Sequence, residues 1–119
     1  MKKNIRLVLV DNAKEAFVKL NEIVGEQTKK GLTNSQEMRL LKSIKNKIDL
    51  LKENPFYGDN IEKKKIPKGY NVPNLWRVEL TNYWRMLYTL RGDEIEVVCF
   101  VLEIIDHKKY NKIFGYKKK

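Results

Sequence analysis

Alternating apolar and charged residues in the segment NLWRVELTNYWRMLY, residues 74–88, constrain the fold of this chain more than any other feature. In an extended strand, successive side chains point to opposite faces. Trp76 and Val78 therefore share one face. Arg77 and Glu79 share the other. A period of two predicts a β-sheet with a buried apolar face and arginines on the opposite face.

The register of a hairpin within this segment follows from matching its apolar faces. The second strand repeats the pattern, with Trp84 on the apolar face and Arg85 on the charged face. Bringing both apolar faces to the same side requires an odd number of loop residues, and residues 81–83 supply three. This register places Glu79 opposite Arg85. We therefore expect Arg77, Glu79 and Arg85 to converge on the charged face.

A third strand is expected over about residues 95–105, which are apolar almost throughout. Gly92 suits the first central position of a type II′ turn, because glycine adopts a positive φ without strain. Such a turn would pair Tyr88 with Val97 and continue the apolar face across the third strand. Cys99, the single cysteine of the chain, lies in this apolar run, so we expect a buried thiol rather than a reactive one.

Two helices are expected before the hairpin. Residues 4–10 form an apolar run of strand length, and Asp11 after it suits a helix cap. Apolar residues then recur at helical spacing until the pattern fades near Gly31. A second amphipathic helix begins after Thr33, where a capping box has the right spacing, and ends at Asn54. The two segments predict a helical hairpin with one apolar stripe on each helix.

The expected fold is α+β, in a single domain that spans residues 1–119. An N-terminal strand leads into the helical hairpin, and a three-stranded antiparallel meander follows. Both helices are expected to pack on one face of the sheet, over its apolar side, which leaves the charged face partly open. At 119 residues, such a domain buries enough apolar surface to fold without disulfides or metals.

Residues 55–74 contain all three prolines of the chain and no regular period, so we expect a loop. Candidate nucleic-acid-binding residues are the lysines of this loop and those after the last strand: Lys63, Lys64, Lys65, Lys68, Lys108 and Lys109. The net charge of +10 is spread over both halves of the chain, and a domain this basic attracts polyanions by releasing their counterions. A lysine-rich or heat-adapted proteome is the alternative source of such a charge.

Beyond the third strand, the segment DHKKY carries His107, the only histidine of the chain, and Tyr110. Cleavage of RNA by its own 2′-hydroxyl requires a base, cations near the phosphorane and an acid for the leaving oxygen. Residue types that suit these roles are present at Arg77, Glu79, Arg85, His107 and Tyr110. The structural alternative is a cross-strand ion pair of Arg85 with Glu79 and a surface histidine at a strand end. Because His107 has no partners at ligand spacing, no metal or cofactor is expected.

The order of elements, with LWRVEL, YWRMLY and VLEIIDHKKY at their places, resembles the RelE/ParE superfamily of type II toxins. The resemblance covers nearly the whole chain and is densest from Leu75 to Tyr110. It implies helices on one face of the sheet and a concave working surface on the other. RelE-like members of that superfamily enter the ribosomal A site and cut mRNA by 2′-hydroxyl attack without a metal, and a cognate antitoxin inhibits them.

The resemblance implies roles for the two arginines and for Glu79. Arg85 in YWRMLY matches the superfamily's Tyr-Arg-hydrophobic-hydrophobic-Tyr signature, apart from one extra residue between Tyr83 and Arg85, and would stabilise the transition state. Arg77 in LWRVEL matches a basic residue of the preceding strand and would bind phosphate. Glu79 stands where some members have a lysine, and it either supplies a carboxylate base or weakens the phosphate site.

Two further roles are implied at the C-terminal end. His107 falls where the superfamily has a basic residue or a histidine after its last strand, and we expect it to transfer a proton. Tyr110 lies near the superfamily's terminal tyrosine, which stacks on the substrate base. The spacing from His107 to Tyr110 is shorter than in several members, so Phe114 and Tyr116 are alternatives for stacking.

The expected function is thus that of a toxin in a type II toxin–antitoxin system, a metal-independent endoribonuclease that cuts mRNA on the ribosome. One alternative is the ParE branch, in which the same fold poisons DNA gyrase, and another is an inactive protein that binds nucleic acid or antitoxin. ParE-like members generally lack the basic cluster and the histidine, so Arg77, Arg85 and His107 favour the nuclease. No apolar run approaches the roughly 18 residues that span a bilayer, so we expect a cytoplasmic protein without membrane contact.

Overall fold

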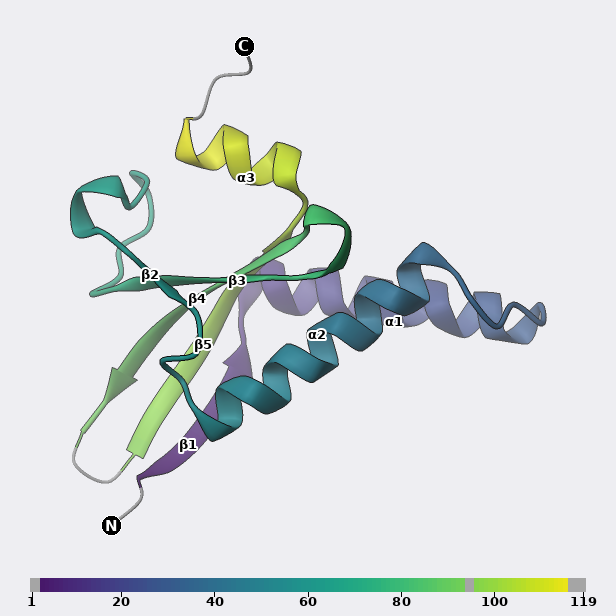
Figure 1. Ribbon diagram of the computed structural model, residues 1–119, viewed down its shortest axis with the longest axis horizontal. Helices are drawn as coiled ribbons and strands as arrows, with labels where there is room; N and C mark the ends of the chain where they lie inside the picture. Colours follow the sequence, from purple (N-terminus) through teal and green to yellow (C-terminus); the bar gives the residue numbers. More distant parts are fainter. Residues whose placement is uncertain (1–2, 94–95, 116–119) are drawn as a thin grey trace.

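A five-stranded mixed sheet organises the computed structural model, which describes residues 3–93 and 96–115 (Figure 1). The strands lie in the order β1-β5-β4-β3-β2 and comprise β1 (Asn4–Leu9), β2 (Asp59–Ile61), β3 (Leu75–Glu79), β4 (Arg85–Gly92) and β5 (Glu96–Ile105). The helices are α1 (Asp11–Lys29), α2 (Gln36–Glu53) and α3 (His107–Phe114), with single 3-10 turns η1 (Lys63–Lys65) and η2 (Thr81–Tyr83). The predicted order lacked β2 and α3.

The β3/β4 hairpin has the predicted register. Glu79 pairs with Arg85 across the 3-10 turn η2, and the remaining pairs follow in step. Trp76 and Trp84 are partly buried against the apolar core, on the same face as the fully buried Met86. The predicted register holds because Trp76, Val78, Trp84 and Met86 share one face, Arg77, Glu79 and Arg85 share the other, and the loop is short.

The register predicted for β4 and β5 was wrong. Tyr88 pairs with Val101 rather than Val97, and Gly92 itself pairs with Val97 inside the ladder. The Asp93 backbone N–H donates to the Glu96 carbonyl at 2.9 Å, so backbone pairing continues beyond Gly92. A Cβ atom on Gly92 would meet the Glu96 carbonyl oxygen at 2.6 Å, so close strand approach, not a turn position, explains this glycine.

A bulge in β5 decides which side chains reach each face of the sheet. Tyr88 pairs with Val101 but Leu87 pairs with Glu103, so Leu102 is an extra residue in β5. After the bulge the alternation is inverted, and Ile104 faces the same core as Val101. Glu103 consequently lies on the opposite face, where a strand without the bulge would not have placed it.

Helices α1 and α2 cover one face of the sheet, here called the α1/α2 face (Figure 1). Its buried core residues are Ala13, Leu20, Leu40, Leu41, Ile44, Leu51, Val78, Leu80, Met86, Tyr88, Leu90, Cys99, Val101 and Ile104. The helical residues among them follow the spacing of three and four that predicted the amphipathic stripes. This part of the expected packing is confirmed.

Helix α3, which was not predicted, lies on the other side of the sheet, here called the α3 face, so the helices do not all pack on one face (Figure 1). Asp106 caps α3 by accepting from the Lys109 N–H at 2.8 Å, and Gly115 ends it with a φ of 73°. Tyr110, Ile113 and Phe114 face the sheet from α3. Their spacing of three and four was a helical signal that the sequence analysis did not use.

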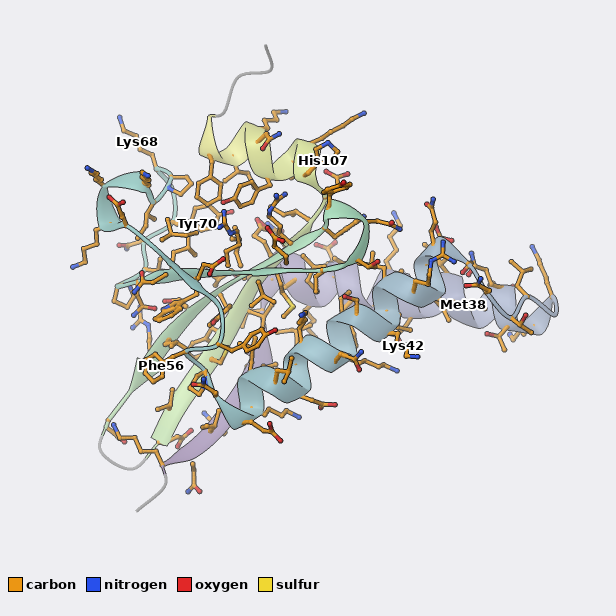
Figure 2. The ribbon with its side chains drawn as sticks, in the orientation of Figure 1. Met38, Lys42, Phe56, Lys68, Tyr70 and His107 are labelled. Carbon is orange, nitrogen blue, oxygen red and sulfur yellow. The ribbon has the colours of Figure 1, made fainter. Side chains whose placement is uncertain are left out.

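Segment 61–72 also covers the α3 face. Ile61, Ile66, Tyr70 and Val72 pack there around buried Leu75, Leu87, Ile105 and Tyr110. Lys68 and His107 both lie on this side of the sheet, whereas Phe56 lies on the opposite side (Figure 2). The charged face of the hairpin was predicted to be partly open. It instead carries a second small core.

The helix caps differ from those predicted. Val10 precedes α1 and no side chain caps that helix, while Asp11 is already its first residue. Ser35, not Thr33, caps α2, because its hydroxyl accepts from the Met38 N–H at 3.0 Å. The Ser35 hydroxyl also donates to the Gln27 side-chain oxygen of α1 at 2.6 Å, so this cap ties the two helices together.

Candidate functional site

Tyr110 joins the two arginines that the sequence predicted as site residues. The Arg77 guanidinium donates a hydrogen bond from Nη1 to the Tyr110 hydroxyl at 2.8 Å. The Arg85 guanidinium carbon lies 4.6 Å from the centroid of the same ring, within cation–π range. Phe114 stacks on the ring with centroids 4.3 Å apart. The structure therefore brings Arg77, Arg85 and Tyr110 together, from two strands and α3.

Strand β2 supplies a carboxylate to Arg77. Asp59 pairs with Arg77 in the β2/β3 ladder, and its Oδ2 atom lies 3.3 Å from Arg77 Nη2. Burial acts to lower the pKa of the Arg77 guanidinium, but Tyr110 and Asp59 together raise that pKa above its ordinary value. Asp59 was not predicted as a site residue, because β2 is short and aspartate is rare in strands.

The Nε atoms of Arg77 and Arg85 are buried, and neither has a hydrogen-bond partner within the described residues. Each unpaired buried donor costs about 1–3 kcal/mol. Two positive groups that contact one tyrosine ring also repel each other. Bound phosphate would offset the repulsion, so this pair of arginines has the electrostatic character of an anion site.

His107 lies beside Tyr83, a residue that the sequence analysis did not propose for the site. Their ring centroids are 6.0 Å apart and meet edge to face. The Tyr83 carbonyl accepts a long hydrogen bond of 3.4 Å from Arg85 Nη1. Tyr83 therefore links His107, the first residue of α3, to the arginine pair. The position of Tyr83, as the first residue of YWR at the end of a short loop, was the signal available in the sequence.

Glu79 is exposed and lies opposite Arg85 in the ladder. No ion pair within 4.0 Å connects the two side chains, and the described residues provide no other salt bridge to Glu79. The cross-strand ion pair between Glu79 and Arg85, which was the structural alternative, is therefore not formed. Glu79 also lines a hollow with Tyr83 and Arg85, so its carboxylate stands beside the site without being neutralised.

The lysines predicted to bind nucleic acid lie in two regions, segment 61–72 and the first turn of α3. Lys63, Lys64 and Lys65 form η1, where Glu62 lies within 4.0 Å of Lys64 and Lys65. Lys65 lines a hollow of about 150 Å³ with Asp59, Arg77, Tyr110 and other residues of this face. Lys68 is exposed further along the same segment (Figure 2). Lys108 and Lys109 are exposed on the first turn of α3.

A buried carboxylate anchors the lysine-bearing segment to the sheet. Glu103 is only 5% exposed, and its Oε2 atom accepts a hydrogen bond of 2.9 Å from the Tyr70 hydroxyl. Burial and the neighbouring Glu103 carboxylate raise the pKa of Tyr70, so the phenol remains a donor. This contact ties the segment between η1 and β3 to the strand beside β4.

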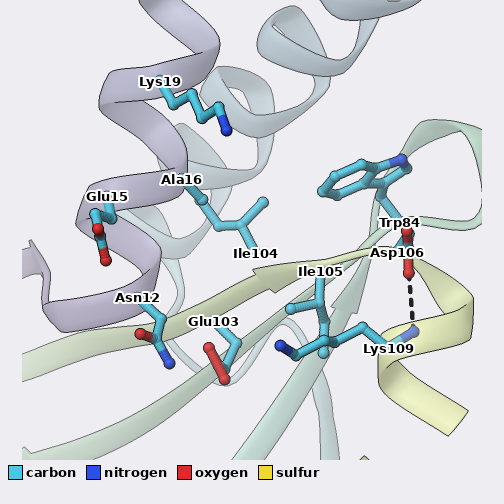
Figure 3. A pocket seen from close by; sticks show the side chains of 10 residues that line it. All are labelled: Asn12, Glu15, Ala16, Lys19, Trp84, Glu103, Ile104, Ile105, Asp106 and Lys109. Carbon is cyan, nitrogen blue, oxygen red and sulfur yellow. Dashed lines mark hydrogen bonds between the residues drawn. The ribbon is translucent and has the colours of Figure 1, made fainter. Parts of the chain in front are cut away.

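A different hollow, of about 400 Å³, lies between α1 and α3 (Figure 3). Glu15 and Glu103 line it together with Lys19 and Lys109, so its charges are mixed. Neither Arg77 nor Arg85 reaches this hollow, and Lys109 thus faces a different opening from Lys65. The arginine pair, not the larger hollow, is the place where positive charge is concentrated.

Of the predicted stacking residues, Tyr110 and Phe114 do not lie on an open surface. Tyr110 is 3% exposed, between Phe114 and the arginines. Phe114 is partly buried in the same core, and Tyr116 lies outside the described residues. The buried position gives Tyr110 a clear structural function, which is to hold Arg77 and Arg85 in place.

Residues 3–93 and 96–115 contain neither a metal-binding cluster nor a membrane-spanning helix. No group of three or more His, Cys, Asp or Glu side chains lies close enough there to hold a metal ion. Across the same ranges, no helix combines the length and apolar character needed to span a membrane.

Comparison with solved structures shows the class of fold. The chain is similar to a YoeB/ParE toxin from Agrobacterium tumefaciens, with a TM-score of 0.58 and 15% sequence identity. The match covers 86% of this chain and 98% of the toxin chain. No protein-family model and no curated protein sequence matches. The chain therefore has the fold of this toxin, whereas its activity has to be argued from its own residues.

Proposed function

We propose that this protein is the toxin of a type II toxin–antitoxin pair and an mRNA endonuclease of the RelE-like branch, acting on the ribosome. The Arg77–Tyr110–Arg85 cluster carries this proposal, because it brings two guanidinium groups together on a toxin fold, and among the described residues a carboxylate pairs with Arg77 but not with Arg85. His107 and Glu79 add titratable groups beside that charge. The proposed partners are a cognate antitoxin, the ribosome and mRNA.

The proposed reaction uses a nucleophile that RNA itself contains. A 2′-hydroxyl loses its proton to a base and its oxygen attacks the adjacent phosphorus, while the bond from phosphorus to the 5′-oxygen breaks. An acid protonates the departing 5′-oxygen, so the products are a 2′,3′-cyclic phosphate and a 5′-hydroxyl. Arg77 and Arg85 stabilise the charge that develops on the phosphorane oxygens. The lysines Lys63, Lys64, Lys65, Lys68, Lys108 and Lys109 bind nucleic acid backbone around the site.

His107 is the proposed proton-transfer residue, with Glu79 as the alternative base. His107→Gln keeps a polar group of similar reach but cannot carry a proton near neutral pH. It is expected to lower the cleavage rate on programmed ribosomes by about a hundredfold and to change ribosome affinity only a few-fold. Equal losses of rate and affinity would instead make His107 a docking residue.

A defined mRNA on purified ribosomes tests the proposed function. The wild-type protein is expected to cut the ribosome-bound mRNA and to leave the free mRNA intact. A single 2′-deoxy nucleotide on the 5′ side of the cut removes the nucleophile and should abolish cleavage at that position alone. Persistent cleavage there would exclude attack by the 2′-hydroxyl.

The main alternative is inhibition of DNA gyrase, which the ParE part of the similar toxin's name brings into consideration. Gyrase supercoiling is measured with the same preparation of protein. Gyrase inhibition without mRNA cleavage would replace the proposal by that alternative. Neither effect would identify an inactive protein that binds nucleic acid or an antitoxin.

A further inference from the structure

Tyr83 is a strongly exposed aromatic residue at the end of the β3/β4 hairpin. Its side chain is 75% exposed, more than any other large hydrophobic residue among the described residues. The other strongly exposed aromatic residues each contact a neighbour, as Tyr83 contacts His107: Phe56 packs edge to face against Trp76, and Tyr57 contacts Lys47. A single exposed aromatic residue is common on a protein surface, so the backbone and the neighbours of Tyr83, rather than its exposure alone, point to a role in binding.

The backbone holds this ring outward at a cost. Asn82 and Tyr83 have φ values of 54° and 62°, in the left-handed region. Asparagine tolerates that region, but a tyrosine there is uncommon and costs on the order of 1 kcal/mol. The 3-10 turn η2 thus presents an exposed aromatic ring at the end of the β3/β4 hairpin.

The exposed ring stands directly beside the groups proposed for the chemistry. Its edge-to-face neighbour is His107 at 6.0 Å, and its carbonyl accepts from Arg85. A nucleotide whose phosphate contacts Arg85 would have its base within reach of this loop. Tyr110 is not available for the same purpose, since its ring is 3% exposed.

From this geometry, and resting on the proposed RNA cleavage, we infer that Tyr83 stacks on a base next to the scissile phosphate. Stacking fixes the nucleotide and so aligns its phosphate with Arg85 and His107. Every base has a π-face, so such a contact tolerates different sequences and contributes to orientation rather than to base readout. Tyr83 is therefore a substrate-positioning residue of the site.

Substitutions at Tyr83 test the role of the ring. Tyr83→Asn suits the left-handed backbone and removes the aromatic surface. It is expected to lower kcat/KM about tenfold to a hundredfold, which corresponds to the loss of one stacked base. Tyr83→Trp retains an aromatic face and is expected to stay within about threefold of wild type. Tyr57→Asn removes an exposed tyrosine near the end of α2 and is the matched control, with unchanged activity.

An abasic nucleotide distinguishes stacking from an indirect effect through His107. The mRNA carries one abasic residue, placed in turn on each side of the cut, and is cleaved by wild type and by Tyr83→Asn. If Tyr83 stacks on the missing base, the two changes are not additive, and the abasic substrate is cleaved equally by both proteins. Full additivity at both positions, or no loss in Tyr83→Asn, would overturn the inference.

Failure of the proposed function gives a different result. If the wild-type protein does not cut intact mRNA on the ribosome, RNA cleavage itself is wrong and the stacking role falls with it. If wild type cuts normally and Tyr83→Asn behaves additively, the nuclease stands and only the role of Tyr83 is refuted. The thermal midpoint of each variant verifies folding, and little change is expected because a 75% exposed side chain leaves no cavity.

Discussion

The two faces of the sheet bury different kinds of side chains. On the α1/α2 face, the core is apolar, and its one buried hydroxyl, that of Tyr88, donates to the Pro55 carbonyl and accepts from the Gly58 N–H. On the α3 face, a smaller core includes Tyr110 and lies beside the buried Glu103 and the unpaired Nε atoms of the arginines. The Tyr88 hydroxyl on the first face has hydrogen-bond partners, whereas the two arginine Nε atoms on the other face have none within the described residues.

This difference separates stability from function. Burying apolar area stabilises a fold by roughly 25 cal/mol per Å², and the α1/α2 face provides most of that burial. Buried, unpaired donors and adjacent like charges reduce stability, so their presence on the α3 face requires another explanation. Binding of an anionic substrate supplies one. Four predictions test the contrast, from the largest expected effect to the smallest.

Truncating the α1/α2 core is expected to cost the most stability. Ile44 is fully buried, so Ile44→Ala should lower the free energy of unfolding by about 2–5 kcal/mol. Leu50, on the same helix, is 36% exposed, and Leu50→Ala should cost about 1 kcal/mol or less. Urea denaturation measures both. Equal losses would show that the α1/α2 core is not the main source of stability.

Removing an arginine from the α3 face should reduce activity and leave stability nearly unchanged. Arg85→Ala is expected to raise the barrier to RNA cleavage by about 3 kcal/mol, or about a hundredfold in rate. The stability of Arg85→Ala should stay within about 1 kcal/mol of wild type. The variant loses the cation–π contact to Tyr110, but it also removes an unpaired buried donor, and the two effects oppose each other. Arg91→Ala removes the same charge from an exposed part of β4 and serves as the control. Unchanged cleavage by a folded Arg85→Ala protein would refute the assignment.

The buried polar contact on the α3 face can be separated from catalysis. Tyr70→Phe removes the hydroxyl that donates to Glu103 and leaves that carboxylate without its partner, which should cost about 1–3 kcal/mol of stability. Adding Glu103→Gln to Tyr70→Phe should recover part of this loss, because a neutral amide is easier to bury than a carboxylate. Thermal unfolding of the single and double variants measures the recovery. A further loss in the double variant would contradict this account.

Alkaline pH should lower the stability of the protein through groups on both faces of the sheet. Burial raises the pKa of Tyr70 and Tyr88 above 10.0, and it raises the pKa of Cys99 to about 12. The native state therefore keeps protons that the unfolded chain releases, and stability falls as pH rises, from about pH 9 for the thiol and about pH 10 for the phenols. Each group contributes a slope of at most about 1.4 kcal/mol per pH unit.

Urea midpoints between pH 8 and pH 11, as rough limits of the titration range, measure this slope. Tyr70→Phe should remove the contribution of the α3 face and leave those of Tyr88 and Cys99 on the α1/α2 face. An unchanged slope in Tyr70→Phe would mean that Tyr70 titrates alike in the native and unfolded states.

Local patterns were sufficient for much of the fold. The period of two in residues 74–88 and the odd loop predicted the pairing of Glu79 with Arg85. The helical spacing of apolar residues predicted α1, α2 and the face that they cover. For the site, the sequence singled out Arg77 and Arg85, which the structure joins through Tyr110.

Contacts between distant segments were decided only by the tertiary structure. The extra residue Leu102 inverts the alternation of β5, and its place depends on pairing with β4, which no local pattern encodes. Strand β2 exists because its polar segment pairs with the free edge of β3 and so brings Asp59 to Arg77. Docking of α3 buries Tyr110 and leaves Tyr83 exposed beside His107. Sequence periodicity reports which faces of an element are apolar, but which partner covers a face depends on the free energy of the whole packed chain.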